Sequence, residues 1–295
     1  MMQFSDSHCH LDDSAFTEQL PLLLAQCQQL AINRIIVPTI APNKFTEVLN
    51  LAKEYHSNPI KIYPCLGIHP WFLQALDNDH LAQLSALVDK SRHEIVAIGE
   101  IGLDGAIAKN APTHGQTTEE NWAHQQHFFD YQLNLAKQQN LPVIVHHRQS
   151  HDKIMPFLRR YKLAKAGVIH GFSGSYQQAM SYIDLGFKLG IGSTITYSRA
   201  KKTINTVKRL PLESLVIETD APSMPLSKEV LSNAISPYSE STTQGVKQGA
   251  ENVTLPVNSP VNLIKIFEVL VTIRAESAEQ IAQQLERNIA QLFFT

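Results

Sequence analysis

Short apolar runs rich in β-branched residues alternate with longer amphipathic segments along the 295-residue chain, and this alternation limits the possible fold more than any other feature. The strand-like runs are Phe4 to His8, Arg34 to Thr39, Ile62 to Leu66, Ile95 to Ile101, Pro142 to His146, Gly167 to His170, Phe187 to Ile191 and Leu215 to Glu218. Helical spacing of apolar residues fills Phe16 to Leu30, Pro42 to Tyr55, Asp79 to Lys90, Asn121 to Gln139, His151 to Tyr161, Ser175 to Leu185, Arg199 to Leu210, Pro260 to Arg274 and Ala278 to Phe293. Because parallel strands need crossover connections, this order predicts an α/β fold, a single (β/α)8 TIM barrel over residues 1–295.

Two stretches interrupt the rhythm, Gly105 to Glu120 and the polar segment from Ser227 to Pro256. Both follow strand-like runs that end in acidic residues. Loops at the carboxyl ends of barrel strands tolerate changes in length, so we expect both stretches to be loop insertions on the rim of the barrel.

The composition is that of an ordinary globular protein, with 43% hydrophobic and 18% charged residues. The formal net charge of -2 offers no global basic field for nucleic acid, so binding to a polyanion would depend on a local patch or a metal. The three cysteines, Cys9, Cys27 and Cys65, form no metal-binding or disulfide pattern. No signal peptide or apolar stretch of about 20 residues is present. We therefore expect a soluble, cytoplasmic protein with no membrane contact. The low net charge and the lack of an evident exposed apolar stripe favour a monomer.

Histidines and acids gather at the ends of the expected strands. They are His8 and His10 after the first strand, His69 after the third, Glu100 at the fourth, His146 and His147 at the fifth, His170 at the sixth and Asp220 after the eighth. In a barrel all these strand ends meet at one mouth, so the residues should converge on one pocket.

Four histidines and two carboxylates exceed what one zinc ion needs, but they suit two divalent cations about 3.5 to 4 Å apart that share a bridging acid. Glu100 is the natural bridge between them. The alternative is that each strand-end histidine only caps backbone groups, which is reasonable for one residue but not for six that converge.

Several strings resemble the TatD-type metal-dependent deoxyribonucleases, a family within the amidohydrolase-like barrel hydrolases. They are Ser7-His8-Cys9-His10-Leu11-Asp12, Gly67-Ile68-His69-Pro70-Trp71, Ala97 to Asp104, Leu141 to Arg148, His170 to Ser175, Gly190-Ile191-Gly192 with Thr196-Tyr197, and Glu218-Thr219-Asp220-Ala221-Pro222. The likeness runs nearly end to end and implies the barrel fold independently of the hydrophobic pattern.

The resemblance also implies a role for each matching residue. His8, His10 and Asp220 would hold a first metal, His146 and His170 a second, and Glu100 both. Asp220 and Glu100 would be the catalytic carboxylates, with Asp220 taking the proton from the attacking water. The cofactor would be two divalent ions, Mg, Mn or Zn.

Substrate contacts can be suggested from chemistry. Arg148 offers forked donors to a phosphate, and His69 offers an N–H, although a core role beside Trp71 is as reasonable for His69. Asp104 could orient a ligand histidine or serve only as a turn residue. His147 should point away from the metals because neighbouring residues on a strand face opposite ways.

The expected activity is a 3'-5' exonuclease acting on DNA ends, with DNA as the partner. Two other readings stay open at this point. The same centre could hydrolyse carboxylic esters or amides such as aminoacyl-tRNA esters. The chain could also be a metal-binding partner protein with vestigial activity.

Overall fold

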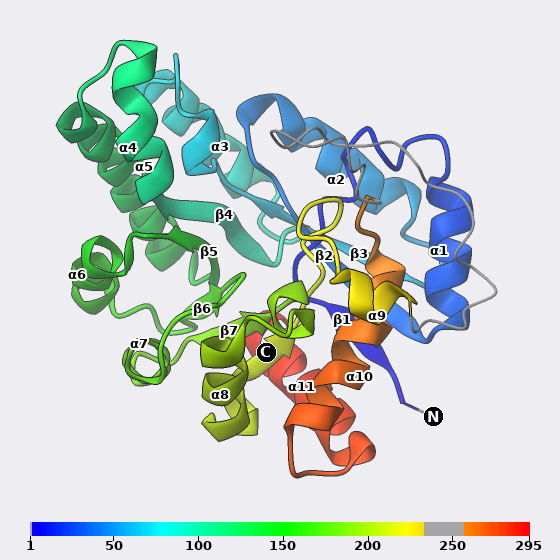
Figure 1. Ribbon diagram of the computed structural model, residues 1–295. Coiled ribbons are helices and arrows are strands. Elements are labelled where there is room, and N and C mark those ends of the chain that lie inside the picture. Colours follow the sequence, from blue (N-terminus) through cyan, green and yellow to red (C-terminus); the bar gives the residue numbers. More distant parts are fainter. Residues whose placement is uncertain (1, 233–256) are drawn as a thin grey trace.

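The computed structural model describes residues 2–232 and 257–295, and it contains an eight-stranded parallel sheet whose strands follow one another in chain order. The strands are β1 (Phe4–Asp6), β2 (Ile32–Pro38), β3 (Lys61–Leu66), β4 (Ala97–Asp104), β5 (Val143–Arg148), β6 (Gly167–Ile169), β7 (Lys188–Ile191) and β8 (Leu215–Ile217). Figure 1 shows the helices arranged around these strands. The predicted TIM barrel is confirmed.

Helices connect successive strands, as the crossover rule requires. The connecting helices are α1 (Leu20–Gln29), α2 (Phe45–Glu54), α3 (Asn78–Lys90), α4 (Gly105–Asn110), α5 (Thr118–Gln139), α6 (His151–Tyr161), α7 (Tyr176–Ile183) and α8 (Lys201–Arg209). Three more helices follow β8, namely α9 (Lys228–Ser232), α10 (Leu263–Ile273) and α11 (Ala278–Phe293). Short 3-10 turns precede or follow several of them, at Pro42–Lys44, Pro70–Phe72, Ala111–His114, Ser193–Thr196, Leu212–Ser214 and Pro260–Asn262.

Side chains from most of the strands fill the interior of the barrel. These buried residues are Ile36, Cys65, Ala97, Ile144, Val168 and Val216, and they pack with Ile289, Leu292 and Phe293 of α11. The amide of Asn288 in α11 also donates to the carbonyl oxygens of Leu212 and Leu215, where β8 begins. Helix α11 therefore closes the amino-terminal end of the barrel, and the opposite end remains for a site.

The seam between β8 and β1 is closed by few bonds. The Ser7 amide donates to the Ile217 carbonyl (3.0 Å), and the Asp220 amide donates to the His8 carbonyl (2.8 Å). The buried Asp6 carboxylate adds a side-chain link, because it accepts from the Thr219 amide (3.0 Å) and hydroxyl (2.5 Å). The first and last strands are thus joined next to the residues that follow them.

The stretch from Gly105 to Glu120 is not the loop that we expected. It forms α4, a 3-10 turn and the start of α5, because the Asp104 carboxylate caps α4 by accepting from the amides of Ala106 and Ile107. The second expected insertion, Ser227 to Pro256, begins with α9, and its remainder from residue 233 lies outside the described residues.

Several element boundaries also differ from the predictions, and two of them have a clear local cause. Helix α1 begins at Leu20 rather than Phe16, because Pro21 fits only the first turn of a helix. Strand β4 continues to Asp104 rather than stopping at Ile101, since Gly102 lets its backbone approach β5. A Cβ at Gly102 would lie 2.1 Å from the carbonyl oxygen of His146, and its φ is +143°.

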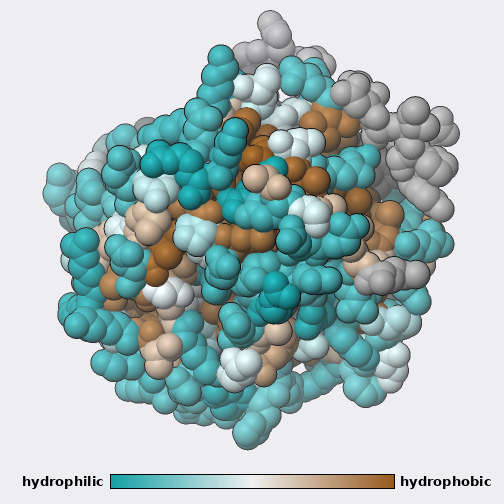
Figure 2. All heavy atoms as spheres, turned by 90° about the horizontal axis from the view of Figure 1, so that it is seen from below, coloured by the Kyte–Doolittle hydropathy of each residue, from teal (hydrophilic) through white to brown (hydrophobic). Residues whose placement is uncertain are grey.

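Figure 2 shows one face of the molecule on which hydrophilic side chains predominate, with apolar groups visible between them. No helix in residues 2–232 and 257–295 is long and apolar enough to cross a membrane.

Candidate metal centre

Glu100, in the middle of β4, lies at the centre of the predicted cluster and is 2% exposed. Its two carboxylate oxygens face different sets of histidines. Burial alone would raise the pKa of this carboxyl, but the surrounding imidazoles hold it well below its usual range. Glu100 is therefore an anion whose two oxygens are both engaged.

The first set of side chains lies around the Oε2 atom of Glu100 and comes from the segments that follow β1 and β8. His8 Nε2 lies 3.2 Å and His10 Nε2 3.6 Å from this oxygen. The same nitrogens lie 3.4 and 3.5 Å from Asp220 Oδ1. Asp220 follows β8 with a φ of +56°, an uncommon value for a residue with a side chain. The seam between β8 and β1 thus brings these three side chains together.

The second set surrounds the Oε1 atom of Glu100. His170 Nε2 lies 2.9 Å and His146 Nδ1 3.3 Å from this oxygen, and the two imidazole nitrogens are 3.4 Å apart. Each histidine has a carboxylate behind it. His146 Nε2 is 3.0 Å from Asp104 Oδ2, and His170 Nδ1 is 3.5 Å from Glu218 Oε1.

Carboxylates behind metal-binding histidines fix the tautomer and the orientation of the ring. Asp104, which the sequence left as either an orienting group or a turn residue, makes both kinds of contact, because its Oδ2 lies 3.0 Å from His146 Nε2 and its Oδ1 caps α4. Glu218 stands in the motif quoted from the sequence, but it was assigned no role there. The pattern that could have revealed it is an acid at the end of β8, two residues before Asp220.

His69 lies against the bridging carboxylate. Its Nε2 is 3.3 Å from Glu100 Oε1, and its Nδ1 accepts a hydrogen bond from the Trp71 amide (3.1 Å). Burial lowers the pKa of His69 to about 4, so the ring is neutral near pH 7. With Nδ1 accepting, the proton sits on Nε2, and His69 donates to Glu100.

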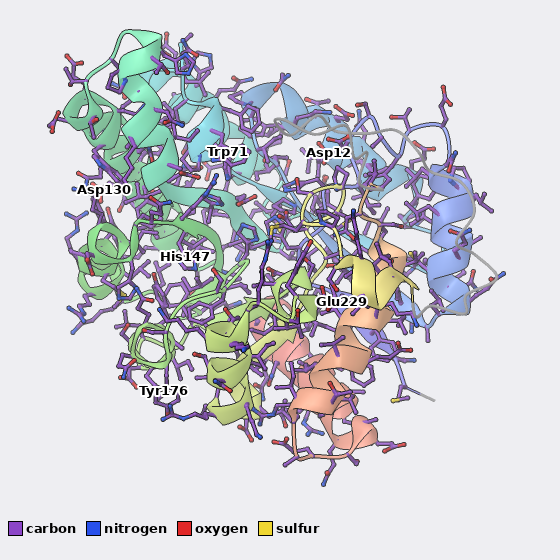
Figure 3. The ribbon with its side chains drawn as sticks, viewed as in Figure 1. Asp12, Trp71, Asp130, His147, Tyr176 and Glu229 are labelled. Atoms are coloured by element: carbon purple, nitrogen blue, oxygen red, sulfur yellow. The ribbon has the colours of Figure 1, made fainter. Side chains whose placement is uncertain are left out.

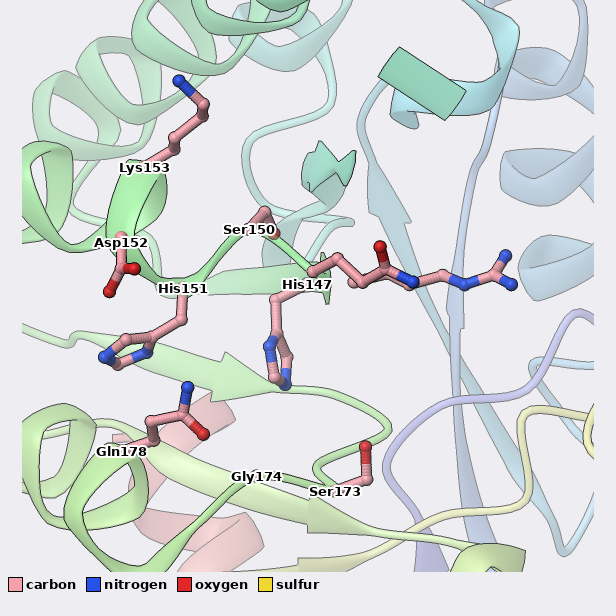
Figure 4. Close-up of a pocket in the computed structure, with 10 residues that line it drawn as sticks. His147, Ser150, His151, Asp152, Lys153, Ser173, Gly174 and Gln178 are labelled. Carbon is pink, nitrogen blue, oxygen red and sulfur yellow. The ribbon is translucent and has the colours of Figure 1, made fainter. Parts of the chain in front are cut away.

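Arg148 and His147 lie beside the cluster. Arg148 ends β5 and is exposed, and the ring of His147 stacks on Phe172 at 5.8 Å and 27°. His147 belongs to none of the candidate metal groups among the described residues. Both residues line a cavity of about 530 Å³, in which His151 faces Gln178 (Figure 4).

The donor set fits divalent cations. Three groups have ligand atoms within 4.8 Å of one another: His8, Glu100 and His170; His8, His10 and Asp220; and His69, Glu100 and His146. Imidazole nitrogens with carboxylate oxygens suit zinc and manganese. The Nε2 atoms of His8 and His10 lie 3.2 Å apart, close enough for one cation to be bound by both.

A parallel barrel with histidines and acids gathered at one end is an arrangement typical of metal-dependent hydrolases. The model of the family described as TatD related DNase matches residues 5–294. The chain belongs to this family.

Individual relatives agree with the family match. The metal-dependent hydrolase YjjV of Escherichia coli K12 is 38% identical over 291 residues, which cover 99% of this chain and 98% of YjjV. A metal-dependent hydrolase of Haemophilus influenzae is 37% identical and covers 99% of this chain and 100% of its own length. The crystal structure of the Escherichia coli TatD homologue YjjV has a TM-score of 0.82 at 37% identity, covering 99% of this chain and 98% of YjjV. The protein is a metal-dependent hydrolase of the TatD family.

Proposed function

We propose that this hydrolase uses two divalent cations to cleave phosphodiester bonds and releases nucleotides from DNA ends as a 3'-5' exonuclease. The observation that carries the proposal is the arrangement around Glu100, whose Oε2 faces His8 and His10 while its Oε1 faces His146 and His170. A carboxylate engaged in this way on both oxygens suits a bridge between two metals.

Each residue then has a defined task. His8, His10 and Asp220 would hold one cation, His146 and His170 the other, and Glu100 both. When bound, Mg, Mn or Zn ions would lower the pKa of a shared water and neutralise charge on the phosphate oxygens.

Asp220 is suited to accept a proton. Burial would raise the pKa of its carboxyl, but the hydrogen bond to His10 and the charges of His170 and His8 lower it, so the group is ionised near pH 7. An ionised carboxylate at this position can take the proton of the attacking water and pass it to the leaving oxygen.

The substrate contacts follow from the same geometry. Arg148 is exposed next to the cluster and can present its forked donors to a phosphate. For His69 the geometry favours a role in holding Glu100, because both of its ring nitrogens are already engaged. DNA would be the partner, and the DNase family of the chain supports a nucleic-acid substrate.

The proposal also covers the state in which the enzyme works. One chain supplies all the ligand groups, so a monomer is sufficient. All three cysteines are free and buried, which suits a reducing compartment such as the cytoplasm.

The test is digestion of single-stranded DNA labelled at either end. Chelated protein is resupplied with Mg, Mn or Zn, and Asp220→Ala is compared with Asp89→Ala, an exposed carboxylate on α3. We expect stepwise shortening from the 3' end with wild type and Asp89→Ala, and none with Asp220→Ala. If DNA stays intact under every metal while aminoacyl esters are hydrolysed, the phosphodiester proposal is wrong.

A further inference from the structure

We propose that Trp71 is a stacking platform for the base of the terminal nucleotide, so that the enzyme selects unpaired nucleic-acid ends that still carry a base. This inference rests on the proposed function and narrows its substrate class. It starts from an aromatic side chain that the metal chemistry does not use.

Trp71 is exposed where a soluble protein normally buries tryptophan. Its exposed fraction is 49%, and its neighbour Phe72 is 42% exposed. The described residues contain only six exposed large hydrophobic side chains, and Trp71, Phe72 and Met224 all follow the carboxyl ends of barrel strands. Half of the exposed large apolar side chains thus lie in segments at the mouth.

The indole is held in place rather than free to move. Its Nε1 donates to Asp104 Oδ2 at 2.6 Å, the same oxygen that contacts His146. The ring meets His69 edge to face at 5.4 Å between centroids, and lies 6.2 Å from the ring of His146. Figure 3 shows Trp71 in the region between α3 and the strands. A preorganised ring beside the cluster loses little entropy when a base stacks on it.

A cation accompanies this ring. Arg148 is paired in register with Asp104, and it leaves β5 on the same face as His146 because the two are separated by one residue. Asp104 therefore accepts a hydrogen bond from the indole of Trp71, and its neighbour on the adjacent strand is Arg148, which carries the guanidinium. An aromatic surface for a base next to a cation for a phosphate is how proteins hold single-stranded nucleic acid.

The competing explanation is that Trp71 only positions His146 through Asp104. The two roles depend on different parts of the side chain, since positioning needs the indole N–H and stacking needs the ring. Trp71→Phe keeps a ring and removes the N–H, whereas Trp71→Ala removes both.

The kinetic test compares two single-stranded oligonucleotides that differ only in their terminal residue, either a thymidine or an abasic tetrahydrofuran. The measured quantity is the ratio of kcat/KM for the two substrates. For stacking, we expect Trp71→Ala to lower this ratio about 10-fold or more, and Trp71→Phe to retain most of it. If both variants lose activity equally on both substrates, the ratio is unchanged and Trp71 only positions His146.

The second test measures binding without catalysis. The chain has two tryptophans, so Trp122→Phe leaves Trp71 as the single indole. Thymidine 5'-monophosphate should quench this fluorescence, with excitation at the red edge of the indole band, and 2-deoxyribose 5-phosphate should not. Equal responses to both ligands would overturn the inference. If wild type cleaves neither oligonucleotide, the proposed function fails, and the fluorescence result still decides whether Trp71 binds a base.

Discussion

Replacing Asp104 with asparagine should separate the role of a neighbouring carboxylate from that of the ligands themselves. The buried Asp104 side chain accepts through Oδ1 from the amides of Ala106 (2.7 Å) and Ile107 (3.0 Å). Its Oδ2 accepts from Trp71 Nε1 (2.6 Å) and lies 3.0 Å from His146 Nε2. Four donors converge on one carboxylate, and asparagine has the same size but only one acceptor atom.

In either orientation of the asparagine side chain, its NH2 group faces N–H groups that donate to the Asp104 carboxylate in the wild type. If its NH2 group replaces Oδ2, it meets the Trp71 N–H, and His146 can adapt only by moving its own proton from Nε2 to Nδ1. That nitrogen faces Glu100 Oε1 at 3.3 Å, so the lone pair aimed at the cluster would be lost. If the amide flips, its NH2 group faces the first backbone amides of α4 instead, and the helix loses its cap.

We expect Asp104→Asn to weaken metal binding or kcat/KM about 10- to 100-fold, which corresponds to roughly 1.4 to 2.8 kcal/mol. Metal affinity is measured by calorimetric titration into chelated protein, and activity with bis(p-nitrophenyl) phosphate. Asp89→Asn, an exposed change on α3, is the matched control. Equal metal affinity and activity for the two variants would refute the argument that Asp104 sets the tautomer of His146.

Two further changes test buried carboxylates at the seam and behind His170. Burial raises the pKa of Asp6 from 3.8 to about 7, so between these pH values the folded state holds a proton that the unfolded state releases. The wild-type protein therefore loses stability as the pH rises from about 4 through 7, by at most about 1.4 kcal/mol per pH unit. Asp6→Asn cannot ionise and its amide can donate to Thr219, so the urea midpoint of the variant should improve relative to wild type across this range, and a constant difference would contradict the assignment. A Cβ at Gly190 would lie 2.1 Å from the buried Glu218 Oε2, and Gly190→Ala should cost about 1 to 3 kcal/mol of unfolding free energy. In Gly192→Ala the nearest atom to the new Cβ would be 3.5 Å away, so this variant should lose less unfolding free energy in the same denaturation experiment. Equal losses for the two variants would show that the Glu218 side chain moves aside without strain.

Much of the fold could be predicted because hydrophobic periodicity records burial directly. A strand such as Val143–Arg148 is buried on both sides before its histidines, and helix α5 shows its apolar face at helical spacing. The start of α1 could not be predicted in this way, because the periodic pattern continues upstream of Pro21. Helix α4 was missed because Gly105 favours a loop, whereas the Asp104 cap depends on a side-chain conformation that the pattern does not show.

The residues that converge at the mouth could be predicted from strand ends, but the division of labour among them could not. Which oxygen of Glu100 faces which histidine depends on side-chain rotamers inside the barrel. The position of Glu218 behind His170 depends on the absence of a side chain at Gly190, a contact between different strands. Such details come from packing of distant segments, and a sequence pattern is silent about them.

The seam between β8 and β1 sets the order in which a growing chain can build its centre. The Oε1 half of the centre consists of Glu100 with His146 and His170, which come from β4, β5 and the residue after β6. A nascent chain that has been synthesised just beyond β6 already contains all three residues. The Oε2 side cannot be completed then, because Asp6 and Thr219, which join the two ends of the barrel, are 213 positions apart. Until translation reaches that point, the residues that join β8 to β1 have not been made, and His8 and His10 lack Asp220. Synthesis thus separates the two halves of the centre in time.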